Sequence, residues 1–238
     1  MKNILIFLFL VSISNYTFSQ NRESSIIEKM TQDVKHLASD QLEGRETGTI
    51  GEKKAAKYIR QQFKENGLVQ KGSKRYFQSF KTSINRNPHS NEKKEEIRGL
   101  NVIGFCDNGQ KETIIIGAHY DHLGKGHYGS LHTGPEEIHN GADDNASGVS
   151  ILINLIERLC ENDLYNYLFI AFSGEEIGLL GSSYFAKNPT IELSNVKFML
   201  NFDMVGRLNH KRELAINGTG TSNKWNELIQ ESNDFNLH

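Results

Sequence analysis

Apolar positions recur at helical spacing in two segments near the start of the chain. Residues 24–38 carry apolar side chains three or four positions apart, which predicts an amphipathic helix. A second stripe runs from the capping-box pair Thr49 and Glu52 to Gly67 and predicts another helix. The segment 42–45 between them, Leu-Glu-Gly-Arg, is predicted to be a loop. Both helices are expected to serve packing only.

Later in the chain, short apolar strands alternate with helices. The predicted strands are 75–84, 100–105, 113–117, 167–172, 196–202 and 213–216, and the predicted helices are 149–159, 179–187 and 225–229. The polar run 85–96 is predicted to be an exposed loop. Strands that are apolar on both faces and alternate with helices are typical of a largely parallel sheet. We therefore predict an α/β fold, a three-layer α/β/α sandwich with a mostly parallel central sheet.

The first twenty residues have the layout of a secretory signal peptide. Lys2 gives a positive start, residues 4–11 are apolar, and residues 16–20 are small and polar. The apolar stretch is too short for a comfortable membrane span. We expect residues 1–20 to be removed, so that residues 21–238 form one exported domain, periplasmic or secreted, with no membrane span after cleavage.

Charge and cysteine content narrow the possible partners. The 27 basic and 29 acidic side chains give a formal net charge of -2, which favours neither a nucleic-acid nor a membrane-surface partner. Cys106 and Cys160 lack the CxxC spacing of a metal site. Export would permit a disulfide between them, but we expect two separate buried thiols because sequence alone does not bring them together.

Acidic and imidazole side chains follow three of the predicted strands. They are His119 and Asp121 after strand 113–117, Glu175 and Glu176 after strand 167–172, and Asp203 after strand 196–202. The carboxyl ends of parallel strands meet at one edge of a sheet, where sites form in such folds. Imidazole and carboxylate groups are the usual ligands of catalytic zinc. The sequence therefore predicts a two-metal hydrolase centre at this edge.

The segment from Gly141 to Gly148 supplies a further carboxylate pair directly before the predicted helix 149–159. Small residues permit a tight turn there, and the positive end of the helix faces the acids. Asp143 is well placed to bridge two metal ions because its two oxygens can bind different ions. Asp203, after an apolar strand, is expected to be a buried charge that needs a cation.

Supporting roles are predicted for the remaining polar residues. Asp121 is expected to accept the second ring N–H of His119 and fix its tautomer. Of Glu175 and Glu176, one would bind metal and the other would act as general base, unless the pair only caps the next helix. Four further histidines are expected to be mostly exposed bystanders, namely His122, His127, His132 and His139.

Four motifs in order resemble those of the M28 zinc aminopeptidases. They are residues 116–122 (Ile-Gly-Ala-His-Tyr-Asp-His), 141–148 (Gly-Ala-Asp-Asp-Asn-Ala-Ser-Gly), 172–179 (Phe-Ser-Gly-Glu-Glu-Ile-Gly-Leu) and 201–204 (Asn-Phe-Asp-Met). Residues 42–45 and Gly48 also resemble the N-terminal part of exported bacterial members. The resemblance extends from about residue 30 to about residue 210.

The resemblance implies a complete set of roles. Asp143 would bridge two zinc ions, His119 and Asp203 would complete one, and Glu176 would bind the other. Glu175 would be the general base toward a water shared by the ions, and a cis peptide would join Asp143 to Asp144. The implied activity is hydrolysis of peptide substrates by an exported two-zinc aminopeptidase.

One ligand of the family pattern has no counterpart in this sequence. The family completes its second zinc with a histidine near a Ser-Asp-His stretch well after the position of Asp203, whereas His210 follows Asp203 too closely and His238 lacks the motif. We expect a C-terminally truncated chain without the last strands. Two alternatives stay open: a non-catalytic metal- or peptide-binding protein, and a single-zinc glutaminyl-peptide cyclotransferase, against which the set Asp143, Glu176 and Asp203 argues.

Overall fold

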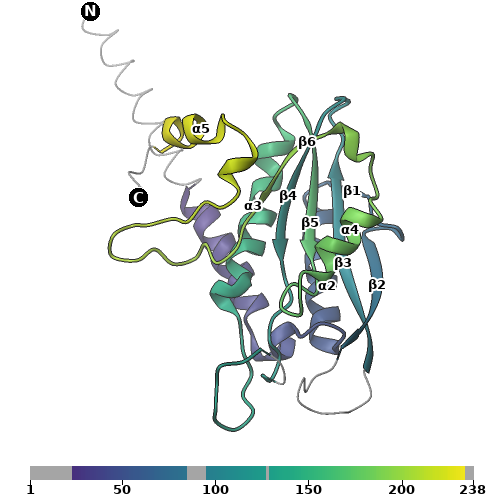
Figure 1. Cartoon of the computed structure of the whole chain (residues 1–238), viewed down its shortest axis with the longest axis vertical. Helices are drawn as coiled ribbons and strands as arrows, with labels where there is room; N and C mark the ends of the chain where they lie inside the picture. Colours follow the sequence, from purple (N-terminus) through teal and green to yellow (C-terminus); the bar gives the residue numbers. More distant parts are fainter. Residues whose placement is uncertain (1–22, 85–94, 127–128, 234–238) are drawn as a thin grey trace, which may run out of the picture.

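A six-stranded sheet forms the centre of the computed structural model, which describes residues 23–84, 95–126 and 129–233 (Figure 1). The strands are β1 (Val69–Gln70), β2 (Phe77–Ile84), β3 (Glu95–Cys106), β4 (Thr113–His119), β5 (Asn166–Phe172) and β6 (Val196–Asn201). Their order is β1-β3-β5-β4-β6, and β2 pairs with β3. The predicted signal peptide lies outside the described residues, as does most of the predicted loop 85–96, whose last two residues begin β3.

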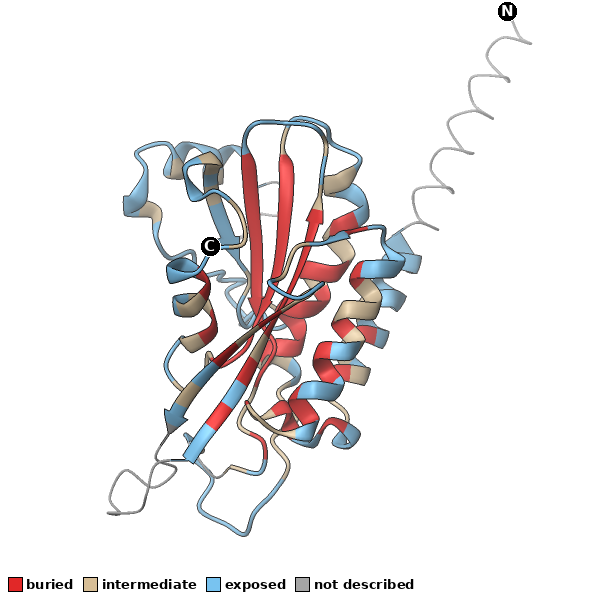
Figure 2. Ribbon diagram, turned by 90° about the vertical axis from the view of Figure 1, so that its right-hand side faces the viewer, coloured by how far each residue is buried: buried red, intermediate tan, exposed pale blue. Residues whose placement is uncertain are grey.

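Helices cover both faces of the sheet, as predicted. One face packs against a helix over residues 23–37 together with α2 (Ile50–Glu65) and α3 (Gly148–Cys160), and the other packs against α4 (Leu180–Lys187) (Figure 2). All seven residues of β5 are buried because both layers cover this strand. A last helix, α5 (Trp225–Glu231), follows β6, and no strand forms over the predicted segment 213–216. Short helical turns complete the described chain: η1 (Asp40–Arg45), η2 (Ala142–Ser147), η3 (Leu193–Asn195) and η4 (Thr219–Thr221).

The sheet is parallel only in the half that carries the predicted site. β4 pairs in parallel with β5 and with β6, whereas β3 runs antiparallel to β1, β2 and β5. The segment between Ile84 and Glu95 is shorter than the dozen or so residues that a parallel crossover needs, so β2 and β3 pair antiparallel. The α/β sandwich is thus confirmed. The sheet, predicted to be mostly parallel, is mixed, with parallel pairing on both sides of β4 and antiparallel pairing on both sides of β3.

The two cysteines form a disulfide, contrary to the expectation of separate thiols. Cys106 ends β3 and Cys160 ends α3, and their Cα atoms lie 5.9 Å apart, within the usual range for a disulfide. The bond therefore ties the sheet to the helical layer over a sequence separation of 54 residues. Within the described part of the chain, none of the helices is both long and apolar enough to cross a membrane.

Glu52 is a fully buried carboxylate beneath the predicted site. Thr49 caps α2 as predicted by accepting a hydrogen bond from the Glu52 N–H, but the Glu52 carboxylate faces inward. It accepts hydrogen bonds from the Gly48 N–H (2.8 Å), the Leu100 N–H (3.1 Å) and the Ser173 hydroxyl. Burial raises the pKa of Glu52 from 4.5 to about 7 even though these hydrogen bonds oppose the shift.

Glu52→Gln should therefore change how stability depends on pH. The unfolded chain releases the Glu52 proton near pH 4.5 and the folded chain near pH 7, so the folded state binds the extra proton between these values. The free energy of unfolding consequently falls as the pH rises through this window, and the glutamine variant lacks that contribution. The quantity to measure is the free energy of unfolding of the variant minus that of the original chain, obtained by urea unfolding. We expect this difference to rise by roughly 3 kcal/mol between about pH 4 and pH 8. Glu23→Gln, at an exposed position, serves as control, and a pH-independent difference at Glu52 would contradict the assignment.

Candidate metal centre

The predicted residues meet at the carboxyl ends of β4, β5 and β6. His119 ends β4, Glu175 and Glu176 lie on the turn after β5, and Asp203 lies two residues after β6. The fourth segment is η2, directly before α3, which brings Asp144 to the same place. The prediction of one shared edge, made from strand order alone, thus agrees with the structure.

The first cluster of donor atoms contains His119, Asp144 and Asp203, whose ligand atoms all lie within 4.8 Å of one another. His119 Nε2 is 3.2 Å from Asp144 Oδ1 and 3.2 Å from Asp203 Oδ1. The His119 side chain is buried, whereas that of Asp203 is 47% exposed because it follows an edge strand. The expectation of a buried Asp203 was therefore wrong, and its charge alone does not demand a cation.

The second cluster contains His122, Asp144 and Glu176, again with ligand atoms within 4.8 Å of one another. His122 Nδ1 is 2.5 Å from Glu176 Oε1 and 3.9 Å from Asp144 Oδ2. The two oxygens of Asp144 therefore face different clusters. His122, expected to be an exposed bystander, has only 10% of its side chain exposed.

Asp144, rather than Asp143, lies between the two clusters. The carboxylate of Asp143 turns toward the chain after β6, where its Oδ1 accepts hydrogen bonds from the Gly206 N–H (2.8 Å) and the Ser147 hydroxyl (3.3 Å). The backbone of Asp144 is not helical (φ -104°, ψ 95°), which separates the directions of the two neighbouring side chains. A cis peptide joins Asp144 to Asn145, one position after the bond that the resemblance implied.

Asp121 holds the turn that carries the glutamate pair. Its fully buried carboxylate accepts hydrogen bonds from the Glu175 N–H (3.1 Å), the Glu176 N–H (3.4 Å) and the Thr47 hydroxyl (2.9 Å). The second ring nitrogen of His119 lies 3.2 Å from the main-chain carbonyl of Asp121 and 3.8 Å from its carboxylate. The ring contact predicted for the Asp121 carboxylate is therefore made by its carbonyl, and the carboxylate positions Glu175 and Glu176 instead.

Glu175 lies beside the first cluster without belonging to either one. Its Oε2 is 4.0 Å from His119 Nε2, and its side chain is 32% exposed. Burial raises the pKa of Glu175, and the nearby charges of Asp121, Glu176 and Asp203 raise it further. The pair does not cap a helix, since α4 begins only at Leu180 and has no acid in its first turn. A carboxylate with a raised pKa at the rim of the clusters suits proton transfer.

Arg45 is a buried residue that connects the segments carrying the clusters by hydrogen bonds to their main chains. Its buried guanidinium donates hydrogen bonds to the main-chain carbonyls of Tyr120 (2.8 Å), Asn140 (2.8 Å), Gly141 (2.9 Å) and Leu37. Tyr120 lies between His119 and Asp121, and Gly141 opens the turn to Asp144. Burial lowers the pKa of Arg45 to about 10, which still leaves a cation at neutral pH beneath the acidic cluster.

Asn145 fixes Asp203 relative to Asp144. Its side-chain amide donates to the Phe202 carbonyl (2.9 Å), and its carbonyl oxygen accepts from the Met204 N–H (3.3 Å). These two main-chain groups flank Asp203 on either side. The same oxygen accepts from the Gly148 N–H (3.0 Å) at the start of α3. One side chain thus aligns the end of β6, η2 and α3.

The chemistry of the donors fits a divalent cation such as zinc. Each cluster offers one imidazole and two carboxylates, which are the ligand types of catalytic zinc. Burial opposes a charge on His119, yet its hydrogen bonds to Asp144 and Asp203 raise the pKa of His119 to about 10. The surrounding carboxylates therefore stabilise positive charge at this point, as a bound cation requires.

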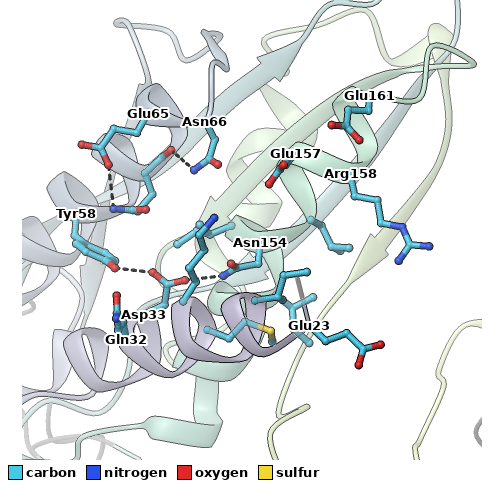
Figure 3. A pocket seen from close by; sticks show the side chains of 17 residues that line it. Glu23, Gln32, Asp33, Tyr58, Glu65, Asn66, Asn154, Glu157, Arg158 and Glu161 are labelled. Carbon is cyan, nitrogen blue, oxygen red and sulfur yellow. Dashed lines mark hydrogen bonds between the residues drawn. The ribbon is translucent and has the colours of Figure 1, made fainter. Parts of the chain in front are cut away.

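A larger cavity lies away from the two donor clusters and does not bring imidazole and carboxylate groups together as they do. It has a volume of about 870 Å³ and lies between the helix over residues 23–37, α2 and the far end of α3 (Figure 3). Its buried carboxylate, Asp33, accepts hydrogen bonds from the Tyr58 hydroxyl (2.6 Å) and the Asn154 amide (2.7 Å). Both oxygens of Asp33 already have partners, and the candidate metal-binding clusters found among the described residues lie away from this cavity.

Similarity to known proteins centres on the segment that carries the clusters. A family model described as Peptidase family M28 matches residues 101–236, more than half of the chain. The alkaline phosphatase isozyme conversion protein of Escherichia coli (strain K12) is 32% identical over 181 residues, covering 71% of this chain and 49% of that protein. Aminopeptidase Y of Saccharomyces cerevisiae is 31% identical over 123 residues, covering 50% and 20%. The chain spans about half or less of the length of these relatives.

Solved structures share the fold at low sequence identity. A glutaminyl cyclase of Bacteroides thetaiotaomicron aligns with a TM-score of 0.66 and 18% identity, covering 86% of this chain and 70% of that chain. A Zn-dependent exopeptidase from Parabacteroides distasonis aligns with a TM-score of 0.56 and 18% identity, covering 80% and 64%. At this identity the likeness concerns the fold, and it agrees with the predicted α/β sandwich of the zinc-peptidase type.

Proposed function

Because this chain belongs to peptidase family M28, we propose that it is a zinc-dependent exopeptidase that removes residues from the amino ends of peptides. The observation that carries the proposal is the pair of donor clusters that share Asp144, with Glu175 beside them. The proposed ligands are His119, Asp144 and Asp203 in one cluster, and Asp144 and Glu176 in the other. The stoichiometry of two ions per chain is part of the proposal.

Zinc in such a site polarises a peptide carbonyl and makes water more acidic. In the proposed mechanism, Glu175 accepts a proton from the attacking water and delivers it to the leaving amine. Asp121 keeps the Glu175 main chain in place through its hydrogen bond to the N–H. The main-chain carbonyl of Asp121 holds the ring of His119 by its second nitrogen, so that Nε2 faces the cluster.

Export is proposed on two grounds. The layout of residues 1–20 is that of a secretory signal peptide. Cys106 and Cys160 form a disulfide. Disulfides are typical of proteins in oxidising compartments, which exported proteins reach. An exported exopeptidase would meet peptide substrates outside the cytoplasm.

The test is hydrolysis of aminoacyl p-nitroanilides by the zinc-loaded chain. We expect release of p-nitroaniline, loss of at least roughly 90% of it with a zinc chelator, and recovery when zinc is added back. An N-acetylated substrate is the control, since an aminopeptidase requires a free amino end. Zinc binding without cleavage of any substrate would contradict the proposal and favour a non-catalytic metal- or peptide-binding protein.

A glutaminyl cyclase is the second candidate, favoured by the shared fold of the Bacteroides thetaiotaomicron enzyme. Cyclisation of an amino-terminal glutamine releases ammonia and leaves every peptide bond intact, whereas aminopeptidase action releases free glutamine. A glutaminyl dipeptide therefore separates the two activities. The presence of a second donor cluster favours the peptidase.

A further inference from the structure

Positive charge is concentrated in one segment of the chain. Eight of the 27 basic side chains lie within residues 53–75, whereas only one of the 29 acidic side chains, that of Glu65, lies there. The near-neutral net charge of the whole chain therefore hides a strongly basic region. This region comprises most of α2, all of β1 and the turn before β2, along one edge of the sheet.

Four of these cations line a cleft of about 660 Å³ between α2 and the segment 70–77, and they are Lys57, Arg60, Lys64 and Arg75. None of the described residues that line the cleft is acidic. The four cations form no ion pair with any described residue, and Arg60 donates a hydrogen bond to the neutral side chain of Gln61 (3.1 Å). The described part of the chain therefore leaves the positive charge of this cleft without a counterion.

The fold holds the cations on the two walls of the cleft. The three cations of α2 follow one another at intervals of three and four residues, so they lie on one face of the helix. On the other wall, a tight turn is closed by hydrogen bonds from the Gly72 N–H to the Arg75 carbonyl (2.7 Å) and from the Lys74 N–H to the Phe77 carbonyl (2.9 Å). Arg75 has a left-handed backbone (φ 59°), which is uncommon for a residue with a side chain. The turn therefore fixes the direction in which the Arg75 side chain leaves the main chain.

We propose that this cleft binds an acidic segment of a partner polypeptide in an extended conformation. The helix rises by about 6 Å over the four residues from Arg60 to Lys64. Alternate side chains of an extended chain project to the same side and lie about 6.6 Å apart. Carboxylates at alternate positions of the partner therefore match the spacing of the cations on α2. Arg75, on the other wall, offers a guanidinium that binds a carboxylate through two hydrogen bonds.

The cleft is separate from the donor clusters. β1 pairs with Gly104 and Phe105 of β3, which lie beside the first half of β5, whereas the clusters lie at the carboxyl end of β5. Cations on both walls can surround a chain, whereas a flat membrane surface would meet them from one side only. The proposal therefore concerns a partner molecule, and it is independent of zinc binding and of peptidase activity.

The experiment measures the fluorescence anisotropy of a labelled short peptide of alternating glutamate and serine. The peptide is acetylated, so an aminopeptidase cannot shorten it. A matched peptide carries glutamine in place of every glutamate. We expect the original chain to bind the glutamate peptide more tightly than the glutamine peptide, with an affinity that falls as sodium chloride is added. Equal binding of the two peptides, or no binding of the glutamate peptide, would overturn the proposal.

A pair of triple variants places the binding in the cleft. Removal of three exposed cations that line it should weaken binding of the glutamate peptide at least roughly 10-fold, in the variant Lys57→Gln, Lys64→Gln, Arg75→Gln. The control loses the same charge at three exposed positions elsewhere and should bind like the original chain, in the variant Lys111→Gln, Lys187→Gln, Lys224→Gln. Circular dichroism verifies the folding of both variants.

Two outcomes of the variant experiment would overturn the proposal. Equal affinities of the two folded triple variants for the glutamate peptide would place the binding outside the cleft. An original chain that binds heparin or single-stranded DNA, but not the glutamate peptide, would show that the cleft serves a different polyanion. A chain that binds the glutamate peptide in the cleft and cleaves no substrate would contradict the proposed function alone.

Discussion

Asp144→Asn is expected to weaken zinc binding at both clusters, whereas Asp143→Asn should leave it nearly unchanged. One oxygen of Asp144 lies 3.2 Å from His119 Nε2 and the other 3.9 Å from His122 Nδ1, so each cluster contains one of them. An amide offers one oxygen without charge and cannot serve two ions. We expect zinc affinity to fall at least roughly 10²-fold, measured by competition with a chromophoric chelator.

Asp143→Asn is a stringent control because it makes the same change one residue away. The Asp143 carboxylate accepts hydrogen bonds from the Gly206 N–H and the Ser147 hydroxyl, and an asparagine carbonyl oxygen can accept both. Its cost in stability should stay near 1 kcal/mol. Equal losses of zinc affinity in the two variants would contradict the placement of Asp144, and a loss at Asp143 alone would restore the original assignment.

The choice between Asp143 and Asp144 shows where sequence reasoning ends. The pattern of residue types is enough to predict the apolar strands. Because sites in such folds form at the carboxyl ends of the strands, the predicted strands also place both acids at the correct edge of the sheet. The two residues have identical chemistry. Their directions are set by the left-handed Gly141 and the non-helical backbone of Asp144, and no spacing rule encodes either feature.

His122 and the disulfide were missed for a related reason. A histidine one residue past Asp121 has left the strand, so its direction depends on contacts with Arg45 and Gly141 from distant segments. The pairing of Cys106 with Cys160 likewise depends on how α3 lies on β3. Contacts between distant segments determine the direction and the partners of such side chains, whereas the local sequence pattern determines where helices and strands form.

Glu175→Gln should abolish most catalysis while leaving zinc bound. Glu175 belongs to neither donor cluster, and its Oε2 lies 4.0 Å from His119 Nε2, at the rim of the first cluster. Glutamine preserves the size and hydrogen-bonding shape of the side chain but cannot accept the proton. We expect kcat to fall by roughly 10²- to 10⁴-fold with zinc content unchanged, measured on an aminoacyl p-nitroanilide.

The neighbouring Glu176→Gln variant separates proton transfer from metal binding. Glu176 lies in the second cluster, so its variant should lose zinc as well as activity, and excess zinc should restore part of the rate. Excess zinc should not restore Glu175→Gln, because no ligand is missing there. The raised pKa of Glu175, caused by burial and by the charges of Asp121, Glu176 and Asp203, also predicts that kcat/KM falls on the acidic side as this carboxylate takes up a proton. A Glu175→Gln chain with full activity, or one that loses zinc in parallel with activity, would remove Glu175 from its role as the base.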